Sequence, residues 1–527
     1  MKHPFKGRTL AVINDLTNEE RLYLFRKTRE LKEAIEQRNE EKLAAYRIDD
    51  PDFGIYEVFL EDSTRTRESF KNAAKFHRVK LSSLNTDSSS FNKGESYADT
   101  FNTLTGYDNR IFIIRSKLEG VCRWLQEAAA DYAKRNKLTA CPSFINAGDG
   151  KHGHPTQELL DEFTFLEDNG WKNDHLHLAI IGDLFHGRTV HSKAQGLTIF
   201  DHVKVDLIAP KEIALPSSYV ETMEDNGYEV RIFTSIEEYS SQPDIAAKWY
   251  FTRPQLERMG DRILQHQKEL RKSITFDARF MDMLPEGTRF YHPLPRHKGH
   301  PVIPTFLDTT PLNGWERQSA NGMLVRIVLL SLFSGKIGND FIPAHKSPEV
   351  DKYEDFIESV AIETKGEGRR YSEGVHPISE GIVIDHIGKG NTTDEIRSHM
   401  ETITRVLALH GKGGDWVSTS NKNPHLFKGI IFRPDIKEFD RTSLKRLAAI
   451  APGSTLNIIS GGEVKEKYRL HLPPKIYNFE DLSCKNPNCI SNPIHDERVP
   501  AFFWKTKGDE FVCEYCGRHH TFKEIWN

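Results

Sequence analysis

The sequence has little of several features that would assign it to a class of protein. Six cysteines in 527 residues are too few for a scaffold held by disulfides. No apolar run approaches the roughly 18 residues that cross a bilayer, and Met1–Leu10 has basic residues without the apolar core of a signal peptide. The net charge of -4 provides no basic field for nucleic acid or an anionic membrane. These absences predict a cytoplasmic protein with no nucleic-acid and no membrane partner.

Length and periodicity then indicate a chain of several α/β domains. A chain of 527 residues is too long for one hydrophobic core, so two to four domains are expected. Short apolar runs at 55–60, 111–114 and 144–145 alternate with stretches of helical periodicity. This alternation predicts βαβ units and parallel sheets, whose functional loops lie beyond the carboxyl ends of the strands.

The first stretch with specific chemistry is Ser63-Thr64-Arg65-Thr66-Arg67. It follows an apolar run, and Ser63 takes the position of an N-cap before a helix. The first N–H groups of a helix lack intrahelical partners, so a strand, a polar turn and a helix start together make an anion site. Hydroxyl groups add donors, and the planar guanidinium of Arg65 suits phosphate. A single Ser-Thr-Arg would be an ordinary capped helix, but several hydroxyls and two arginines together favour phosphate binding.

The same residues match the carbamoyl-phosphate signature of the aspartate and ornithine carbamoyltransferases, so the chain resembles that family. The resemblance implies two doubly wound parallel-sheet domains, one binding carbamoyl phosphate over 1–150 and one binding aspartate over 151–335. The polar loop 86–97 is by composition a surface loop. It also resembles the family's loop that reaches into the active site of the neighbouring subunit. That role would fall on Ser89 and Lys93, and it implies an obligatory homotrimer.

A glycine-rich stretch ends in His154-Pro155-Thr156-Gln157. Pro155 suits the first turn of a helix. A lone histidine is more often structural, but this one precedes a helix after a predicted strand. His-Pro-Thr-Gln is also a motif of the family, which implies that His154 bonds the carbonyl oxygen of carbamoyl phosphate and that Gln157 holds its amino group. Arg115 closes the apolar run 111–114 and is placed for the same substrate.

The stretch after the apolar run 176–181 is a Gly-rich turn leading into a helix. A dinucleotide site has this pattern, but its G-x-G-x-x-G spacing is absent. The stretch is similar to the start of the family's amino-acid-binding domain, where Arg188 and Thr189 would contact a carboxylate of aspartate. Later motifs of the family add the candidate substrate contacts Arg253, Gln255, Leu294 and Pro295. The last helix of the domain adds Arg326, which would face the phosphate.

The motif His292-Pro293-Leu294-Pro295 favours aspartate as the acceptor. Ornithine enzymes resemble this chain but carry a cysteine in place of Pro293. Aspartate has two carboxylates that pair with arginines, whereas ornithine has a second cation that arginines would repel. A carbamoyltransferase with another amine acceptor is the alternative within enzymes.

The second half begins with a linker, 336–375, in which 354–363 has helical character. Residues 376–475 resemble the regulatory chain of aspartate carbamoyltransferase, an α+β domain that binds nucleotides such as ATP and CTP. The match places the effector site on Asp385, His386, Asn457 and Lys467. Phe432 stands where the family has a lysine, and loss of that cation would weaken binding of a nucleotide triphosphate.

Four cysteines near the end of the chain have the spacing of a metal site. They form two pairs, Cys484-x4-Cys489 and Cys513-x2-Cys516, which are separated by 23 residues. Four thiolates suit tetrahedral Zn²⁺ in a closed, structural site. A zinc ribbon that binds nucleic acid would need a basic stripe interleaved with aromatics, which this segment lacks. The segment 476–527 matches the zinc domain of the regulatory chain, which docks on the catalytic chain.

Together these resemblances imply aspartate carbamoyltransferase with catalytic and regulatory chains fused. This enzyme converts carbamoyl phosphate and L-aspartate to N-carbamoyl-L-aspartate and phosphate in pyrimidine biosynthesis. The carbonyl oxygen would be stabilised by Thr66, Arg115 and His154. The leaving phosphate would be stabilised by Arg65 and by Lys93 of the neighbouring subunit. The regulatory halves suggest that trimers pair into a hexamer. Two alternatives come from another class. The second half could be a nucleotide-sensing or nucleic-acid-binding module attached to an incidental enzyme, or the whole chain could be a purely structural assembly factor.

Overall fold

The structure, a computed structural model, describes residues 3–84, 93–138, 141–255, 267–343, 356–362, 378–390, 392–419, 426–506 and 510–526. The chain forms two compact units. One contains Met1–Lys346 together with Asn486–Val499 and Tyr515–Gly517. The other contains Ser347–Lys485, Pro500–Glu514 and Arg518–Asn527.

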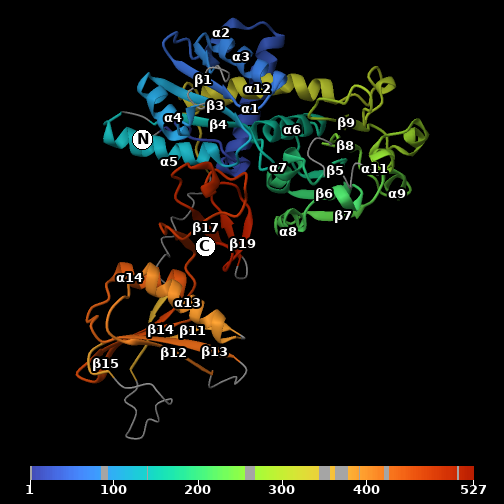
Figure 1. Cartoon of the computed structure of the whole chain (residues 1–527). Helices are drawn as coiled ribbons and strands as arrows, with labels where there is room; N and C mark the ends of the chain where they lie inside the picture. The colour runs from blue at the N-terminus through green and yellow to red at the C-terminus, as the bar shows by residue number, and fades with distance from the viewer. Residues whose placement is uncertain are drawn as a thin grey trace. The chain divides into compact units, whose positions relative to one another are not determined.

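The first unit begins with a parallel sheet in the order β2-β1-β3-β4 (Figure 1). Its strands are β1 (Gly54–Phe59), β2 (Lys80–Ser83), β3 (Asn109–Ser116) and β4 (Ser143–Asp149). The helices of this region are α1 (Asn18–Glu36), α2 (Glu40–Tyr46), α3 (Thr64–His77), α4 (Tyr97–Gly106) and α5 (Val121–Arg135). Residues of β3 and β4 are almost all buried, as expected for strands covered by helices on both faces. The predicted alternation of strands and helices is confirmed, and β2 is a strand that the sequence pattern did not reveal.

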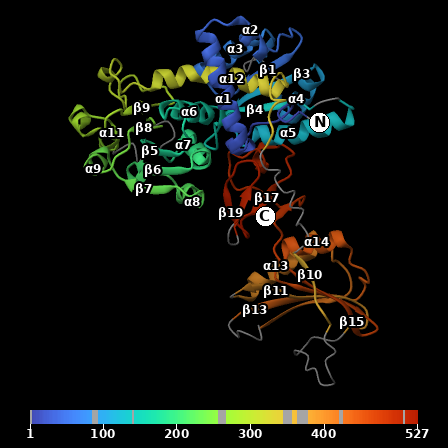
Figure 2. The same cartoon turned by 180° about the vertical axis from the view of Figure 1, so that it is seen from behind.

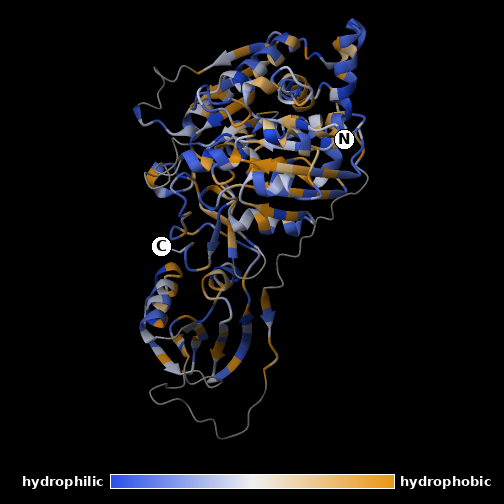
Figure 3. Ribbon diagram, turned by 90° about the vertical axis from the view of Figure 1, so that its right-hand side faces the viewer, coloured by the Kyte–Doolittle hydropathy of each residue, from blue (hydrophilic) through white to orange (hydrophobic). Residues whose placement is uncertain are grey.

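A second parallel sheet follows in the order β7-β6-β5-β8-β9, which Figure 2 shows from behind. Its strands are β5 (His175–Ile181), β6 (His202–Ile208), β7 (Glu229–Phe233), β8 (Lys248–Phe251) and β9 (Arg289–Tyr291). The helices are α6 (Pro155–Asp168), α7 (Arg188–Gly196), α8 (Ser217–Asp225), α9 (Ile236–Ser240), α11 (Gln267–Ile274) and α12 (Trp315–Ser334). Hydropathy colouring shows the apolar strands inside this part of the chain (Figure 3).

Two long helices join the two sheets into one structure. α6 leads from β4 to β5 and packs against both α7 and α12, while α12 also packs against α1 and α3. Both helices are buried along most of their length, and α12 carries apolar residues on nearly all sides. A helix that is apolar all round belongs inside a large core. The loops that follow β1, β3, β4, β5 and β8 therefore have a fixed position relative to one another.

The second unit contains a six-stranded antiparallel sheet in the order β10-β15-β14-β11-β13-β12. The strands are β10 (Ile357–Ser359), β11 (Gly381–Gly390), β12 (Gly414–Thr419), β13 (Phe427–Arg433), β14 (Thr455–Ser460) and β15 (Glu463–Leu470). Two helices accompany the sheet, α13 (Thr393–Val406) and α14 (Arg441–Ile450). This is the α+β arrangement that the sequence predicted.

One prediction for the linker is wrong. The sequence suggested a helix over 354–363, but within the described residues 356–362 the chain forms the strand β10, paired with β15. The backbone N–H of Val360 donates to the carbonyl of Lys467 at 2.9 Å, and that of His471 to Phe356 at 2.7 Å. The exposed edge of β15 offers hydrogen-bond partners that outweigh the weak helical pattern of this short segment.

A small antiparallel sheet, β16-β17-β18-β19, lies near the end of the chain. Its strands are β16 (Lys475–Tyr477), β17 (Phe502–Lys505), β18 (Glu510–Cys513) and β19 (His519–Thr521). Among the helices that the structure describes, none combines the length and the apolar character needed to cross a membrane.

Candidate active site and cysteine cluster

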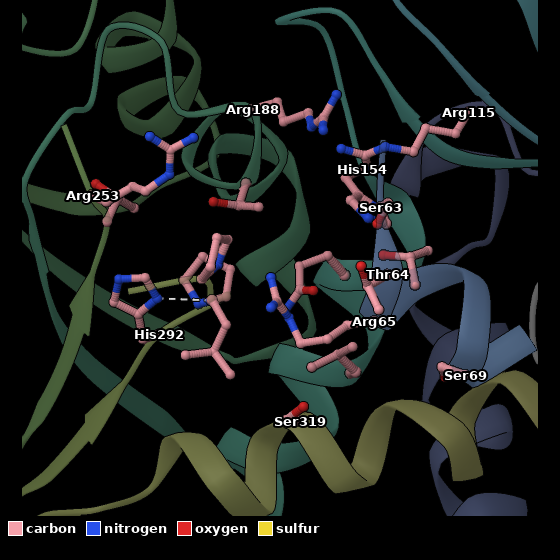
Figure 4. A pocket seen from close by; sticks show the side chains of 18 of the residues that line it. Ser63, Thr64, Arg65, Ser69, Arg115, His154, Arg188, Arg253, His292 and Ser319 are labelled. Carbon is pink, nitrogen blue, oxygen red and sulfur yellow. Dashed lines mark hydrogen bonds between the residues drawn. The ribbon is translucent and has the colours of Figure 1, made fainter. Parts of the chain in front are cut away.

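A polar cavity of ≈ 500 Å³ opens where the loops of the two parallel sheets meet. Its walls come from the turn between β1 and α3, the end of β3, the start of α6, the loops after β5, β8 and β9, and one face of α12. Figure 4 shows that arginine side chains from several of these elements converge on the space. The predicted residues in its wall are Ser63, Thr64, Arg65, Thr66, Arg115, His154, Gln157, Arg188, Thr189, Arg253, Gln255, Leu294, Pro295 and Arg326.

The N-terminus of α3 forms one end of the cavity. Ser63 is the N-cap residue with an extended backbone, and its hydroxyl accepts no capping hydrogen bond from the helix. The first N–H groups of α3 therefore face the cavity with the positive end of the helix dipole. Burial lowers the pKa of Arg65. Arg67 turns away and its Nε donates to Glu57 Oε1 at 2.9 Å, so only one arginine of the motif belongs to the site.

Glu61 lies between two of the arginines, and sequence reasoning missed it. Its Oε2 is 3.0 Å from Arg115 Nη2 and 3.0 Å from Arg188 Nη1. One carboxylate thus neutralises part of the positive charge in the cavity. In the sequence, Glu61 belongs to an acidic pair directly before Ser63. Such a pair also occurs in ordinary polar turns, so the sequence does not assign Glu61 to the site.

His154 is buried at the start of α6, where it is the N-cap residue. Its backbone N–H donates to Ser192 Oγ at 3.2 Å, which ties the loop to α7. Burial and then the charges of Arg188, Arg115 and Arg326 hold the pKa of His154 well below its usual range. A neutral imidazole has one N–H donor, which suits it to bond a carbonyl oxygen without transferring a proton.

Gln157, one turn further along α6, has a defined orientation. Its Nε2 donates to Asp161 Oδ1 at 2.8 Å. Because a carboxylate oxygen can only accept, the amide oxygen of Gln157 is left for other partners. The cavity therefore offers an acceptor at this point, as the amino group of a carbamoyl moiety requires.

The loop after β8 forms the opposite end. Gln255 is held by two hydrogen bonds, from its backbone N–H to Asp183 Oδ2 at 2.9 Å and from its Nε2 to the carbonyl of His186 at 2.8 Å. Figure 4 shows the Arg188 guanidinium beside Arg115, with Arg253 apart from both of them. Guanidinium groups at separate points of the cavity suit a ligand with two carboxylates.

The turn His292-Pro-Leu-Pro closes the cavity near α12. The backbone N–H of Leu294 donates to His292 Nδ1 at 2.7 Å, and that of His292 to Gln318 Oε1 at 2.9 Å. Leu294 has a positive φ of 55°, and the Leu294–Pro295 peptide bond is cis. Burial and three nearby arginines lower the pKa of His292 to about 3, so its ring is neutral.

Arg326 reaches the cavity from α12. Its Nη1 donates to Ser69 Oγ at 2.8 Å, and burial lowers its pKa to about 10. One predicted residue, Lys93, does not line this cavity: it is exposed and precedes α4. Another, Ser89, lies outside the described residues.

The four predicted cysteines come together near the end of the chain. The Sγ atoms of Cys484, Cys489, Cys513 and Cys516 all lie within 4.8 Å of one another, and all four are buried. Ser491 Oγ lies 3.2 Å from the Cys489 sulfur, and His520 Nε2 lies 3.4 Å from that of Cys484. Four buried sulfur ligands in this arrangement fit a tetrahedral, closed metal site. The chain therefore has a metal-binding domain.

Residues within and directly after the first cysteine pair are bound to Glu119 within the first unit. The backbone N–H of Glu119 donates to Asn488 at 2.8 Å, and that of Ile490 to Glu119 at 3.0 Å. Asn486 Nδ2 donates to one carboxylate oxygen of Glu119 at 2.6 Å. The other carboxylate oxygen of Glu119 accepts from the backbone N–H of Lys151 at 3.0 Å. Lys151 precedes His154 in the same loop.

Most predicted effector residues share one face of the six-stranded sheet. Residues directly opposite on paired strands point to the same face. Val383 pairs with Asn457 and with Phe432, and Asn457 pairs with Lys467. Asp385 lies two residues beyond Val383 and accepts from Lys428 Nζ at 3.1 Å. Phe432 therefore lies in the same row.

The opposite face of this sheet carries the fully buried Ile382 and Ile384, which belong to the core of the domain. His386 is exposed and has a positive φ of 64°, at an irregularity in the pairing of β11. The effector positions Asp385, Asn457 and Lys467 thus lie on the more open face of the sheet, and the ring of Phe432 lies in the same row.

Comparison with known proteins agrees with this geometry. Four family descriptions match the chain in order: the carbamoyl-P binding domain of aspartate/ornithine carbamoyltransferase over 8–167, its Asp/Orn binding domain over 174–333, and the allosteric and metal binding domains of the aspartate carbamoyltransferase regulatory chain over 373–471 and 474–526. The fold and the cavity thus define a carbamoyltransferase, which is a transferase enzyme.

Full-length relatives narrow this assignment. Protein PyrBI of Treponema denticola is 62% identical over 530 residues, which cover 100% of this chain and 99% of that protein. Protein PyrBI of Thermotoga maritima is 52% identical over 534 residues and 100% of both chains. The chain belongs to the aspartate carbamoyltransferases in which catalytic and regulatory chains are fused into one polypeptide.

Solved structures resemble the catalytic part. Aspartate transcarbamoylase from Trypanosoma cruzi in complex with N-(phosphonacetyl)-L-aspartic acid is 27% identical and has a TM-score of 0.52, covering 62% of this chain and 96% of that one. The catalytic subunit of M. Jannaschii aspartate transcarbamoylase is 30% identical and has a TM-score of 0.51, covering 62% of this chain and 97% of that one.

Proposed function

We propose that the cavity binds carbamoyl phosphate and L-aspartate side by side and catalyses transfer of the carbamoyl group to aspartate. The observation that carries this proposal is the convergence of Arg65, Arg115, Arg188 and Arg253 on one cavity next to the N-terminus of α3. Four guanidinium groups and a helix start suit a phosphate and two carboxylates.

Carbamoyl phosphate takes the end of the cavity near α3. Its phosphate accepts from the first N–H groups of the helix, from Ser63 and Thr64 and from Arg65, with Arg326 behind. Its carbonyl oxygen accepts from Thr66, Arg115 and the neutral His154. The oxygen of Gln157 accepts from the carbamoyl amino group, as the Gln157–Asp161 bond supports.

Aspartate takes the other end. Arg188, Thr189, Arg253 and Gln255 bind its two carboxylates, and the backbone of Leu294 and Pro295 lies beside its amine. Glu61, which bridges Arg115 and Arg188, gives way to the negative groups of the substrates when both ligands bind.

In the reaction the amine nitrogen of aspartate attacks the carbamoyl carbon. A C–N bond forms, the bond from that carbon to the phosphate oxygen breaks, and the proton of the amine leaves with the phosphate. Negative charge develops first on the carbonyl oxygen and then on the phosphate, where the donors named above stabilise it. Holding both substrates in line supplies much of the remaining acceleration.

Replacing Arg65 with alanine tests this proposal. Loss of one preorganised donor to a developing charge lowers kcat by about 10²–10³-fold. The matched control is Arg67→Ala, because Arg67 pairs with Glu57 outside the cavity. Steady-state rates with aspartate, and with ornithine as a second acceptor, measure the effect. A near-normal kcat in a folded Arg65→Ala protein would contradict the phosphate assignment, and faster turnover of ornithine would contradict the acceptor.

We further propose that Zn²⁺ occupies the four-cysteine site in a structural role, because thiolate donors in a closed set suit this ion. The site would hold the segment 476–527 in its fold and supply no chemistry to the reaction. We also propose that Lys93 and Ser89 complete the cavity of a neighbouring chain in a trimer, and Lys93 is not among the residues that line the cavity of its own chain. A cytoplasmic location and pairing of trimers into a hexamer stay predictions.

The regulatory half is proposed to bind nucleotides on the open face of its sheet. Asp385, Asn457 and Lys467 lie on that face, whereas Phe432 and the Lys428–Asp385 pair reduce its positive charge. Rates measured with and without ATP and CTP test the proposal. A rate that nucleotides shift supports it, and an unshifted rate would assign this half to assembly alone.

A further inference from the structure

Five charged side chains are fully buried behind the active site. Arg21 comes from α1, Glu158, Asp161 and Glu162 come from α6, and Lys193 comes from α7. The side chains of Lys193, Glu158 and Asp161 have no exposed surface. α6 and α7 pack side by side here, and a Cβ atom on Gly196 of α7 would lie 2.5 Å from Glu158 Oε1. Burying charges in this way is costly unless they are paired.

Lys193 pairs with two of the carboxylates. Its Nζ donates to Asp161 Oδ2 at 2.6 Å and to Glu158 Oε2 at 2.8 Å, and it lies 4.1 Å from the centre of the Tyr250 ring. Although burial opposes the charge, Asp161 and Glu158 raise the pKa of Lys193. The ammonium group is therefore charged and holds both carboxylates from one side.

The other oxygen of Asp161 holds two glutamines that reach the active site. Asp161 Oδ1 accepts from Gln157 Nε2 at 2.8 Å and from Gln318 Nε2 at 2.6 Å. An ionised carboxylate forces both amides to turn their NH₂ groups towards it. The oxygen of Gln157 then faces the cavity, and that of Gln318 accepts from the backbone of His292 at 2.9 Å.

We propose that Lys193 is a positioning residue for carbamoyl transfer. By pairing with Asp161, it fixes the orientation of the amide groups of Gln157 and Gln318. Through Gln318 it also fixes the turn at His292. Lys193 itself touches neither the cavity nor a substrate. The inference rests on the proposed role of Gln157 as acceptor for the carbamoyl amino group.

Removing the ammonium group changes what Asp161 can do. Asp161 would then lose the ammonium group that holds its Oδ2, while the amides of Gln157 and Gln318 would remain on its Oδ1. A carboxylate held from one side only no longer keeps both amides in one fixed orientation. Stability alone gives no reason for this lysine, since apolar side chains of similar volume replace buried ion pairs at little or no cost.

The test is the double variant Lys193→Met/Glu158→Gln, which removes one cation and one carboxylate together. We expect a trimer of near-normal thermal stability, with KM for carbamoyl phosphate raised and kcat lowered by about 10-fold each, as for loss of one well-placed hydrogen bond. Asp161→Asn is a second route to the same defect if the double variant does not assemble. The matched control is Arg21→Met/Glu162→Gln. Arg21 of α1 and Glu162 of α6 form an equally buried pair (Nη1 to Oε1, 2.6 Å) that makes no bond to Asp161. Its kinetics should be those of the wild type.

Combination with Gln157→Ala separates positioning from a general structural effect. If Lys193 acts through Gln157, the defect of Lys193→Met/Glu158→Gln shrinks in the Gln157→Ala background. Full additivity, wild-type kinetics in the folded double variant, or an equal defect in the control pair would overturn the inference. Wild-type kinetics in Gln157→Ala alone would instead overturn the proposed role of Gln157, and the inference with it.

Discussion

His154 lies among three arginines, and this placement decides its chemistry. Burial and the charges of Arg188, Arg115 and Arg326 keep its pKa well below the ordinary value of 6.5. A base with a depressed pKa is neutral at every pH above that pKa, so His154 remains a neutral donor throughout the working range. It can bond the carbonyl oxygen but does not act as a proton donor or acceptor near neutral pH.

The pH profile of the enzyme tests this assignment. Between about pH 6 and 9, no protonation step should belong to His154, because its transition lies below that range. His154→Gln should lower kcat by about 10²–10³-fold, as for loss of an oxyanion donor, and leave the shape of the profile unchanged. An acid limb near the ordinary histidine pKa that vanishes in His154→Gln would contradict a neutral His154.

At the scale of single elements, the ends of the parallel strands decide where the substrates bind. β5 ends at Ile181, and the next residue, Gly182, has a φ of 122°. A Cβ atom at this position would lie 2.0 Å from the backbone oxygen of Thr252, which directly follows β8. The close approach of these two strand ends brings Gln255, two residues after Arg253, to Asp183 and His186 in the loop after β5.

Gly182→Ala should therefore harm both stability and aspartate binding. A side chain in this backbone region, combined with a clash against backbone, costs about 2–5 kcal/mol. The control is Gly227→Ala, since Gly227 has a positive φ of 82° but no heavy atom within 4 Å of the position that a Cβ atom would take. Thermal unfolding and KM for aspartate are the measurements. Equal losses of stability in both variants would show that the strand ends are not in tight contact.

At the scale of the whole molecule, the role proposed for Lys93 predicts that one chain alone is not a complete enzyme. Chains with Arg65→Ala and chains with Lys93→Ala should each be nearly inactive. In trimers mixed at random, about a quarter of the sites would receive both intact residues, from two different chains. Measured activity should rise towards that share of the wild-type rate after mixing. Mixed trimers that stay inactive would count against a shared site.

Removal of the metal tests the second half of the chain. Purified protein should contain about one zinc ion per chain, because four thiolates form one closed site. Cys489→Ser should lose the metal and the fold of 476–527, whereas Cys141→Ser, an exposed cysteine outside the cluster, should retain both. Elemental analysis and chelator-induced unfolding measure the outcome. Retention of full metal content in Cys489→Ser would contradict the proposed ligand set.

Some features of this protein follow from local sequence alone. The order of helices and strands, the helix start at Ser63 and the two cysteine pairs depend on spacing within a few residues, where periodicity, capping and chelate geometry act directly. For the same reason the motifs indicated the family and the reaction before any contact was known.

Other features depend on tertiary structure, because they join residues far apart in the chain. Glu61 bridges Arg115 and Arg188, Lys193 reaches Asp161, and Arg67 turns to Glu57, although Arg65 and Arg67 look equivalent in the sequence. The strand β10 forms only because β15 offers it an edge. The sequence by itself determined which elements and which reaction this chain supports, whereas burial and long-range pairing decided which side chains face the substrates and which charges they carry.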